Sequence, residues 1–370
     1  MSKHGRALVA MSGGVDSSVA AVLLHEEGYE VVGITMKTWA YDEAARAKPG
    51  KQVGCCSLDD MHDARAVALR FGFSHFVLDL RDTFGAHVKD TFASEYLAGR
   101  TPNPCVLCNT YIKWDALLRR ADQLGCDTIA TGHYARLRQD DASGRIVLSK
   151  GLDANKDQSY VLWGMPQGQL ARTRLPLGTF DKPTIRQMAH AYGLDTVAAK
   201  PDSYEICFIP DDDYRGYLRR AEPEKTAALA GGPMVLSDGT VVGRHDGYPF
   251  YTVGQRHGLG VALGYPAYVT HLDAATNTVT VGPKDELYRQ TLTADGVNFV
   301  KVPDLREETA VVAKIRSRDE GAPALAWQTG DDALAVAFAA PRAAITPGQA
   351  VVLYEGDDVL AGGWIRSVEG

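Results

Sequence analysis

The sequence predicts an α/β protein with a doubly wound parallel-sheet domain, followed by a small central domain and a C-terminal antiparallel β-barrel. Apolar strand-like runs alternate with amphipathic helical segments through the first 210 residues, which is the pattern of a parallel sheet. After Gly231 the pattern changes to short β-branched runs separated by Gly, Asp and Pro, which is typical of small antiparallel sheets or a barrel. The length of 370 residues exceeds that of most single domains. We therefore expect three domains, over residues 1–210, 211–284 and 285–370.

Within the first domain, each short apolar strand is followed by a helical segment. Strands are expected over residues 6–11, 30–36, 74–80 and 127–132, and in the later domains over 234–236, 278–281 and 350–354. Helices are expected over residues 17–24, 59–71, 112–124 and 181–193, the last with Asp181 as its N-cap and Pro183 in its first turn. A doubly wound sheet binds its ligand at the carboxyl ends of the strands, where Gly14, Met36 and Gly132 fall.

A glycine-rich loop, Ser-Gly-Gly-Val-Asp-Ser-Ser at residues 12–18, joins the first expected strand to the first expected helix. Paired glycines let the backbone turn tightly with its N–H groups exposed, and the helix N-terminus adds partial positive charge. The junction therefore predicts a pyrophosphate cradle. No Gly-Lys-Ser/Thr follows, so the loop is not a Walker A loop, and without that lysine we expect cleavage between the α- and β-phosphates. The alternative is a glycine-rich turn in an ordinary α/β protein.

Charge and composition limit the partners. The formal net charge is −7, so any RNA needs a local basic patch. The first 210 residues are balanced in charge, and the excess negative charge lies in residues 211–370. No long uncharged apolar run is present, so no membrane span is expected. Met1 leads directly into the first expected strand, which leaves no room for a signal peptide, and the six cysteines then indicate a reducing cytoplasm.

A stiff loop at residues 101–109 carries two cysteines, Cys105 and Cys108, and two prolines fix the approach to them. Cys108 lies just before the helix expected at Ile112, where the positive end of the helix would lower the thiol pKa and favour the thiolate. Half of a structural zinc site is the alternative. Such a site needs two further ligands, and no second Cys-x-x-Cys and no His-x-x-x-His occurs.

A third informative segment, residues 200–210, contains Cys207 between apolar neighbours. Burial in a core is one interpretation of that position. A nucleotide-activating loop combined with two separated thiols indicates sulfur transfer instead, in which one thiol carries the sulfur and the other resolves the carrier.

These features resemble those of a known family. The loop at residues 12–18 resembles the PP-loop of ATP pyrophosphatases, and the whole chain resembles the tRNA-specific 2-thiouridylases, which make 2-thiouridine at the wobble position of tRNA. The resemblance extends over essentially the entire chain. It rests on motifs at residues 12–18, 101–109, 130–134, 155–160, 205–208 and 251–256.

The resemblance implies an enzyme that adenylates the uridine and then introduces sulfur from a cysteine persulfide. It implies Cys108 as the nucleophile and Cys207 as the persulfide carrier. The implied ATP-binding residues are Ala10, Met11, Ser12, Gly13, Gly14, Val15, Asp16, Ser17, Met36 and Gly132. The target base would face Asn103, Pro104 and Cys105, and the tRNA would contact Lys156, Asp157, Gln158, Arg316 and Ser317. The implied partners are ATP with Mg²⁺, a tRNA with a wobble uridine, and a sulfur donor such as a cysteine desulfurase or a sulfur-relay protein.

One position departs from some members, because Cys105 stands where many have an aspartate. Cys105 and Cys108 thus form a dithiol, and with Cys207 they offer three thiols that fit an iron–sulfur cluster with an open iron site. Oxidation would join Cys108 to Cys207 in a disulfide if their Cα atoms came within about 7 Å. The remaining cysteines are expected to be structural, Cys126 packed at a turn and Cys55–Cys56 leading a helix.

Two other classes of function remain open at this point. Another PP-loop enzyme, such as an NAD or GMP synthetase, has no use for Cys108 and Cys207. An RNA-binding or redox-sensing module with a vestigial ATP loop is excluded only by an intact Asp16 together with measured pyrophosphate release. His133, which follows the expected strand end at Gly132, is either a phosphate contact or an ordinary turn histidine.

Overall fold

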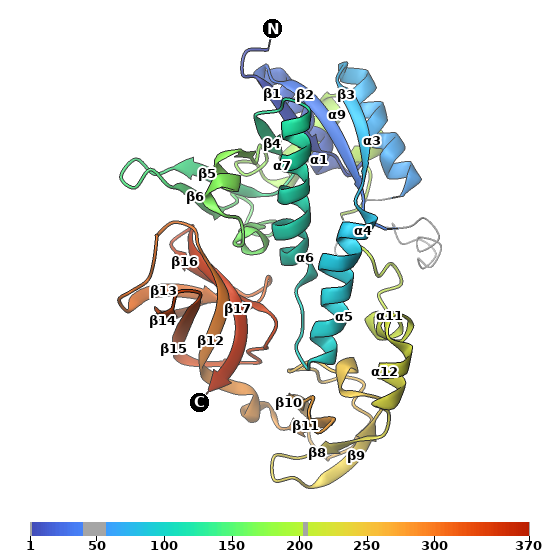
Figure 1. The fold of residues 1–370 in the computed structure, drawn as a ribbon, viewed down its shortest axis with the longest axis vertical. Helices are drawn as coiled ribbons and strands as arrows, with labels where there is room; N and C mark the ends of the chain where they lie inside the picture. The colour runs from blue at the N-terminus through green and yellow to red at the C-terminus, as the bar shows by residue number, and fades with distance from the viewer. Residues whose placement is uncertain (1, 40–56, 203–205, 370) are drawn as a thin grey trace. The chain divides into compact units, whose positions relative to one another are not determined.

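The computed structural model describes residues 2–39, 57–202 and 206–369. The chain forms two compact units, coloured along the sequence in Figure 1. The first unit comprises residues 1–88, 105–212 and 357–359, and the second comprises residues 89–104, 213–356 and 360–370. The division into three domains at residues 210 and 285 stays a prediction, and the Cys55–Cys56 pair lies outside the described residues.

A five-stranded parallel sheet forms the centre of the first unit. Its strands are, in spatial order, β3 (Ser74–Asp79), β2 (Glu30–Lys37), β1 (Arg6–Ala10), β4 (Thr128–Ala130) and β7 (Thr173–Arg174). All four neighbouring pairs are parallel. The chain leaves β1 toward β2 on one side and later returns to β4 on the other, so the strand order reverses at β1. The crevice between the carboxyl ends of β1 and β4 is the usual ligand site of such a sheet.

Helices cover this sheet, as the doubly wound pattern predicts (Figure 1). One core joins β1 and β2 to α1 (Val15–Glu27), α3 (Leu58–Phe71), α9 (Lys182–Ala191) and α10 (Asp195–Ala198). A further helix, α7 (Asp115–Gln123), packs against β1 and β4. The other elements of this unit are α4 (Arg81–Phe84), the hairpin β5 (Ala135–Gln139) and β6 (Ile146–Lys150), η3 (Ser159–Leu162) and α8 (Gln167–Ala171).

Local sequence signals set the ends of the helices around the loop. Ser57 caps α3 by accepting the Asp60 amide at 3.1 Å, and Gly72 ends that helix in the left-handed region at φ 76°. Asp181 caps α9 by accepting the Thr184 amide at 2.8 Å, as expected. These caps fix the starts of two helices that point at the glycine-rich loop.

The helix expected from Ile112 starts earlier than the sequence analysis predicts. The chain already turns helically in α6 (Pro104–Leu107), continues as the π-helix η2 (Cys108–Trp114) and then enters α7. The expectation that Cys108 lies just before the helix was therefore wrong. Proline suits a first helical turn, and the wider π turn lets Asn109, Ile112 and Trp114 all become buried.

Helices and a small mixed sheet make up part of the second unit. The helices are α5 (Asp90–Leu97), α11 (Tyr214–Ala221), α12 (Pro223–Ala228) and η4 (Tyr248–Phe250), and η1 (Gly85–Lys89) leads into α5. The strand order is β10 (Tyr268–Asp273), β11 (Thr278–Gly282), β8 (Gly232–Val235) and β9 (Val241–His245). The rings of Phe92 and Tyr96 lie 5.0 Å apart and join α5 to Tyr214 and Tyr217 of α11.

An antiparallel barrel of six strands ends the chain. Its strands, after η5 (Lys284–Leu287), are β12 (Tyr288–Phe299), β13 (Thr309–Lys314), β14 (Ala322–Gly330), β15 (Ala333–Ala343), β16 (Ala350–Glu355) and β17 (Asp358–Glu369). Pairing of β12 with both β15 and β17 closes the barrel. Its interior is a separate apolar core that includes Leu292, Val336 and Phe338. Across the residues that the structure describes, no helix is long and apolar enough to cross a membrane.

Candidate active site

The glycine-rich loop at residues 12–18 follows β1, at the point where the strand order reverses, and packs between β4 and α3. A Cβ added to Gly132, which follows β4, would lie 2.8 Å from both the carbonyl carbon of Asp16 and the amide nitrogen of Ser17. Gly13 has a φ of +73°, and a Cβ there would lie 2.1 Å from the carbonyl oxygen of Asp60. Only glycine fits at these two positions. The structure thus brings the predicted Gly132 onto the predicted loop.

Hydrogen bonds within the loop hold its shape and leave the start of α1 open. The Ser17 hydroxyl accepts the Ser12 amide at 3.0 Å, and the Ser18 hydroxyl donates to the carbonyl of Gly14 at 2.9 Å. Gly14 is the N-cap of α1 and has no side chain with which to cap it. The first N–H groups of α1 are therefore not satisfied by a cap side chain, which is the condition that favours an anion at a helix N-terminus.

Asp16, in the first turn of α1, is held by two partners from distant parts of the first unit. The Lys182 ammonium lies 2.7 Å from each carboxylate oxygen of Asp16, and the Tyr134 hydroxyl donates to Oδ1 at 2.6 Å. Burial, and then the charge of Asp16, raise the pKa of Tyr134, so the phenol keeps the proton that it donates. The Asp16 side chain remains 34% exposed, whereas that of Lys182 is only 9% exposed.

A second carboxylate, Asp202, organises the cations beside the loop. It pairs with Lys156 at 2.6 Å, with Arg186 at 2.8 Å and with Lys182 at 3.0 Å. Burial alone would raise the pKa of Asp202, but the hydrogen bonds and charges of Lys156 and Lys182 outweigh it and lower the pKa to about 2. Asp202 is therefore ionised at any physiological pH, and it holds the Lys182 ammonium together with Asp16.

Lys200 ties the loop to the start of α3. Its ammonium donates to the Gly13 carbonyl at 3.0 Å and pairs with Asp60 at 2.7 Å and with Asp63 at 2.5 Å. Burial lowers the pKa of Lys200, but these two carboxylates raise it by more, so the ammonium is charged. Because it joins the Gly13 carbonyl of the loop to two carboxylates of α3, Lys200 serves as an internal clamp on the loop.

His133, which the sequence left as either a phosphate contact or an ordinary turn histidine, is buried. Its ring lies 2.6 Å from the Thr131 hydroxyl and 3.4 Å from the Lys113 ammonium, and it packs on Trp114 with ring centroids 5.6 Å apart. Burial, and then the positive charge of Lys113, hold the pKa of His133 well below its usual value of 6.5. The ring is therefore neutral, which makes it a hydrogen-bonding residue at the strand end and not a fixed positive charge.

Met36, the remaining predicted ATP-binding residue, lies near the end of β2 and is half-buried. β2 pairs directly with β1, with Ile34 opposite Ala10. The Thr35 hydroxyl bridges the two strands by donating to the Met11 carbonyl at 2.8 Å. Met36 therefore belongs to the same edge of the sheet as the loop.

The cysteines predicted to carry the sulfur chemistry are at least partly exposed and belong to the first unit. Cys105 is exposed, Cys108 and Cys207 are partly exposed, and Cys126 is buried as expected. Cys207 precedes Phe208, whose buried ring packs edge-on against Phe84 at 5.7 Å. Within the described residues, no three His, Cys, Asp or Glu side chains gather as a metal-binding group.

The residues expected to face the base and the tRNA are distributed over both units. Asn103 and Pro104 belong to the second unit and Cys105 to the first. Arg316 and Ser317 are exposed in the turn between β13 and β14 of the barrel.

The other predicted tRNA contacts already have partners within the first unit. Lys156 pairs with Asp202, and Asp157 accepts the amides of Gly151 and Ser159 at 3.1 and 3.0 Å. Gln158 accepts the Tyr134 amide at 3.0 Å. Of the five predicted tRNA residues, these three thus also stabilise the protein itself.

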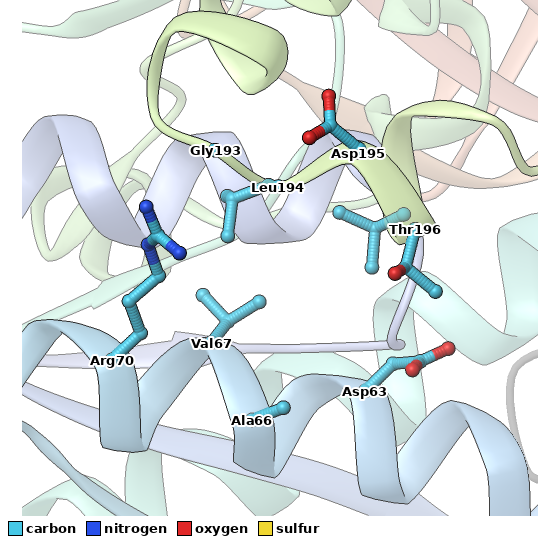
Figure 2. Close-up of a pocket in the computed structure, with 9 residues that line it drawn as sticks. Asp63, Ala66, Val67, Arg70, Gly193, Leu194, Asp195 and Thr196 are labelled. Atoms are coloured by element: carbon cyan, nitrogen blue, oxygen red, sulfur yellow. The ribbon is translucent and has the colours of Figure 1, made fainter.

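A separate pocket of about 250 Å³ lies between α3 and the start of α10 (Figure 2). Figure 2 shows Val67 of α3 and Leu194 facing each other across it, with Arg70 and Asp63 farther apart along the helix. None of the predicted site residues lines it. The pocket touches the loop site only through Asp63, which pairs with Lys200.

Sequence reasoning missed the charged residues that surround the loop, chiefly Lys182, Lys200 and Asp202. Lys182 opens α9 directly after the predicted cap Asp181, and Lys200 and Asp202 precede Cys207. A lysine at a helix start resembles an ordinary exposed residue. Its burial against Asp16, which lies 166 positions earlier, depends on tertiary structure and leaves no local pattern.

A phosphate-binding loop at the switch point of a parallel sheet, surrounded by fixed lysines, defines a nucleotide-binding protein of the PP-loop type. Family models match three consecutive segments: the tRNA methyl transferase HUP domain over residues 5–211, its PRC-barrel domain over 224–283, and the aminomethyltransferase beta-barrel domain over 289–365.

Curated relatives match over the full length of the chain. The tRNA-specific 2-thiouridylase MnmA of Salinibacter ruber is 62% identical over 100% of this chain and 96% of that protein. The protein of the same name from Amoebophilus asiaticus is 57% identical over 99% of this chain and 96% of that protein. A solved 4-thiouridine synthetase–RNA complex with bound ATP has a TM-score of 0.34 and 19% identity, and it covers 60% of this chain and 51% of that one. Likeness at that level carries no argument about function.

The chain belongs to the tRNA-specific 2-thiouridylase family. The name of the family model refers to methyl transfer, whereas the full-length relatives are named for thiolation. The relatives give the more specific description, because they match the whole chain at high identity.

Proposed function

We propose that this protein is an ATP-dependent tRNA-uridine 2-sulfurtransferase, which converts the wobble uridine of tRNA to 2-thiouridine through an adenylated uridine and a cysteine persulfide. The observation that carries the proposal is the lysine-flanked PP-loop in the same chain as partly exposed Cys108 and Cys207. An NAD or GMP synthetase would use the loop but not the thiols. Family membership supports the same choice.

In the first step the C2 carbonyl oxygen of the uridine attacks the α-phosphorus of ATP. The bond between the α-phosphorus and the oxygen bridging to the β-phosphate breaks, and pyrophosphate leaves with its electron pair. Backbone N–H groups within residues 13–17 bind the phosphates, with Ala10, Met11, Ser12, Gly132 and Met36 beside them. The open N-terminus of α1 stabilises the negative charge that develops on the phosphates.

Mg²⁺ fits this site through one carboxylate. Magnesium in nucleotide sites keeps several waters and takes one or two carboxylates together with substrate phosphates. Asp16 is partly exposed, sits in the first turn of α1, and is oriented by the Tyr134 hydroxyl. Asp16 would coordinate the ion, and the ion would neutralise part of the negative charge of the phosphates.

In the second step sulfur replaces the adenylated oxygen. The terminal sulfur of a persulfide on Cys207 attacks C2 and AMP leaves with the original uridine oxygen. The Cys108 thiolate then attacks the Cys207 sulfur, which frees the thiocarbonyl and joins the two cysteines in a disulfide. A dithiol reductant restores both thiols. The partial exposure of Cys207 suits access by a sulfur-donor protein, such as a cysteine desulfurase or a sulfur-relay protein.

The tRNA is bound by both units in this proposal. Asn103, Pro104 and Cys105 face the target base, which is flipped out of the anticodon stack. Arg316 and Ser317, in an exposed turn of the barrel, contact the RNA, and so do residues 156–158. Asp319 shapes that turn by accepting the Ile315 amide at 3.1 Å. We propose the cytoplasm as the compartment, where tRNA and reduced thiols are both present.

The reaction is tested with purified protein, ATP, Mg²⁺, a persulfide donor and an unmodified tRNA transcript with a wobble uridine. The matched control is the same transcript with cytidine at that position. We expect 2-thiouridine by nucleoside mass spectrometry and one pyrophosphate per thiolation, both absent without ATP and with the control transcript. Formation of 2-thiouridine without pyrophosphate release, or no thiolation at all, would overturn the proposal.

A further inference from the structure

Three cations, Lys182, Lys156 and Arg186, gather beside the loop around the carboxylates of Asp16 and Asp202. The Asp153 carboxylate also lies there and accepts the backbone amide of Lys182 at 3.0 Å. Around Lys200, in contrast, one ammonium faces the two carboxylates of Asp60 and Asp63. The site attracts a polyphosphate on the Lys182 side, whereas Lys200 is fully occupied as a clamp.

The loop itself lacks the lysine that grips the β- and γ-phosphates in a Walker A loop, since no Gly-Lys-Ser/Thr follows residues 12–18. The Lys182 ammonium is nevertheless held 2.7 Å from Asp16, in the first turn of α1. Lys182 is also the first residue of α9, whose N-terminal end adds partial positive charge at the same point.

We propose that Lys182 is the pyrophosphate-binding lysine of this enzyme, supplied from α9 in place of a Walker lysine. This inference rests on the proposed function and names a catalytic residue for its first step. When nucleotide binds, the ammonium donates to oxygens of the β- and γ-phosphates and stabilises the leaving pyrophosphate. It keeps its proton throughout. Asp16 keeps the Tyr134 hydroxyl as a partner, and Asp202 keeps Lys156 and Arg186.

The alternative is that Lys182 only neutralises Asp16. The two roles differ in which ligands they affect. Loss of Lys182 leaves the Asp16 carboxylate without its ammonium partner in either role, and this weakens the binding of every anion near the loop. A direct contact with the β- and γ-phosphates adds a further loss for ATP and pyrophosphate that AMP does not share.

The test measures binding of ATP, inorganic pyrophosphate and AMP by calorimetry at fixed Mg²⁺, for wild type, Lys182→Ala and Lys182→Arg. Arg119→Ala, which removes an exposed cation of α7 paired with Asp115, is the matched control. We expect Lys182→Ala to weaken the binding of ATP and of pyrophosphate by on the order of tenfold or more beyond any weakening of AMP. Lys182→Arg should recover part of the loss, and Arg119→Ala should change nothing.

Equal weakening of all three ligands by Lys182→Ala, or no weakening of any, would overturn the inference. Thermal unfolding of each variant confirms that it is folded, and Lys182→Arg provides a second variant if Lys182→Ala is not. Failure of the proposed function is distinguishable, since it appears as a wild-type protein that binds ATP and yields no 2-thiouridine. Single-turnover pyrophosphate release should also fall in Lys182→Ala at saturating ATP, which is a loss in kcat and not only in KM.

Discussion

The ammonium of Lys182 lies 2.7 Å from both carboxylate oxygens of Asp16. The first residue of α9 therefore places a charged side chain against the glycine-rich loop at residues 12–18. Asp202 also pairs with the Lys182 ammonium, at 3.0 Å. In our proposal the phosphate site is therefore built from two segments of the first unit that lie far apart in the sequence. The local loop motif contributes the backbone N–H groups, and the distant segment contributes the charged side chains.

Asp16→Ala is expected to abolish pyrophosphate release while leaving tRNA affinity nearly intact. The carboxylate is the magnesium ligand in our account and has no proposed contact with RNA. The measurement pairs a pyrophosphate-release assay with tRNA binding by filter retention. Ser317→Ala, in the barrel, is the opposite control and should weaken tRNA without affecting ATP binding. Unchanged pyrophosphate release in Asp16→Ala would contradict the assigned role.

Gly132→Ala is expected to impair ATP binding severely, because its Cβ would lie 2.8 Å from backbone atoms of Asp16 and Ser17. The loop must shift to make room, and its N–H groups then leave the phosphates. Gly168→Ala is a matched control, since no atom lies within 4 Å of a Cβ placed there in α8. Calorimetric ATP titration of the two variants decides the matter. Wild-type affinity in Gly132→Ala would mean that the close contact plays no part in nucleotide binding.

His133 should make the stability of the protein depend on pH. Burial, and then Lys113, depress the pKa of His133 in the folded state, so below about pH 6.5 the unfolded chain binds a proton that the folded chain does not. The free energy of unfolding should therefore fall as the pH is lowered from 7 toward 5, by at most about 1.4 kcal/mol per pH unit from this group.

Urea unfolding of wild type and His133→Gln at several pH values measures this slope. The free energy of unfolding of His133→Gln should fall less than that of the wild type as the pH is lowered from 7 toward 5. His190→Gln, at an exposed histidine paired with Asp195, serves as the control. If the wild type and His133→Gln show the same pH dependence, the depressed pKa of His133 does not contribute to folding.

The sequence predicted the parallel sheet, the cap at Asp181, the barrel and the loop, because each leaves a local signal in residue type or spacing. It did not predict the start of the helix at Pro104, since a π-helix has no distinctive pattern and shifts the apolar spacing around Cys108. Nor did it predict the Asp16–Lys182 pair, which joins residues 166 positions apart. This long-range charge pair depends on how α9 packs against α1, and no local pattern in a single sequence reveals that packing.

The roles of the two thiols are separable. With a cysteine desulfurase and labelled cysteine, Cys108→Ser should still acquire a persulfide on Cys207 but make no 2-thiouridine, because the resolving thiol is missing. Peptide mass spectrometry locates the label. Cys126→Ser, at a buried cysteine, is the control and should keep both steps. Label on Cys105 or Cys108 with none on Cys207 would reverse the assignment, and full activity of Cys207→Ser would remove the persulfide mechanism.

The central claim is that the uridine C2 oxygen is activated by adenylation, and it is tested most directly by following that oxygen. A tRNA carrying ¹⁸O at C2 of the wobble uridine is thiolated with ordinary ATP in ordinary water, and the AMP released is analysed by mass spectrometry. Our account predicts one ¹⁸O atom in each AMP formed per 2-thiouridine. AMP without ¹⁸O, with thiolation proceeding, would contradict it.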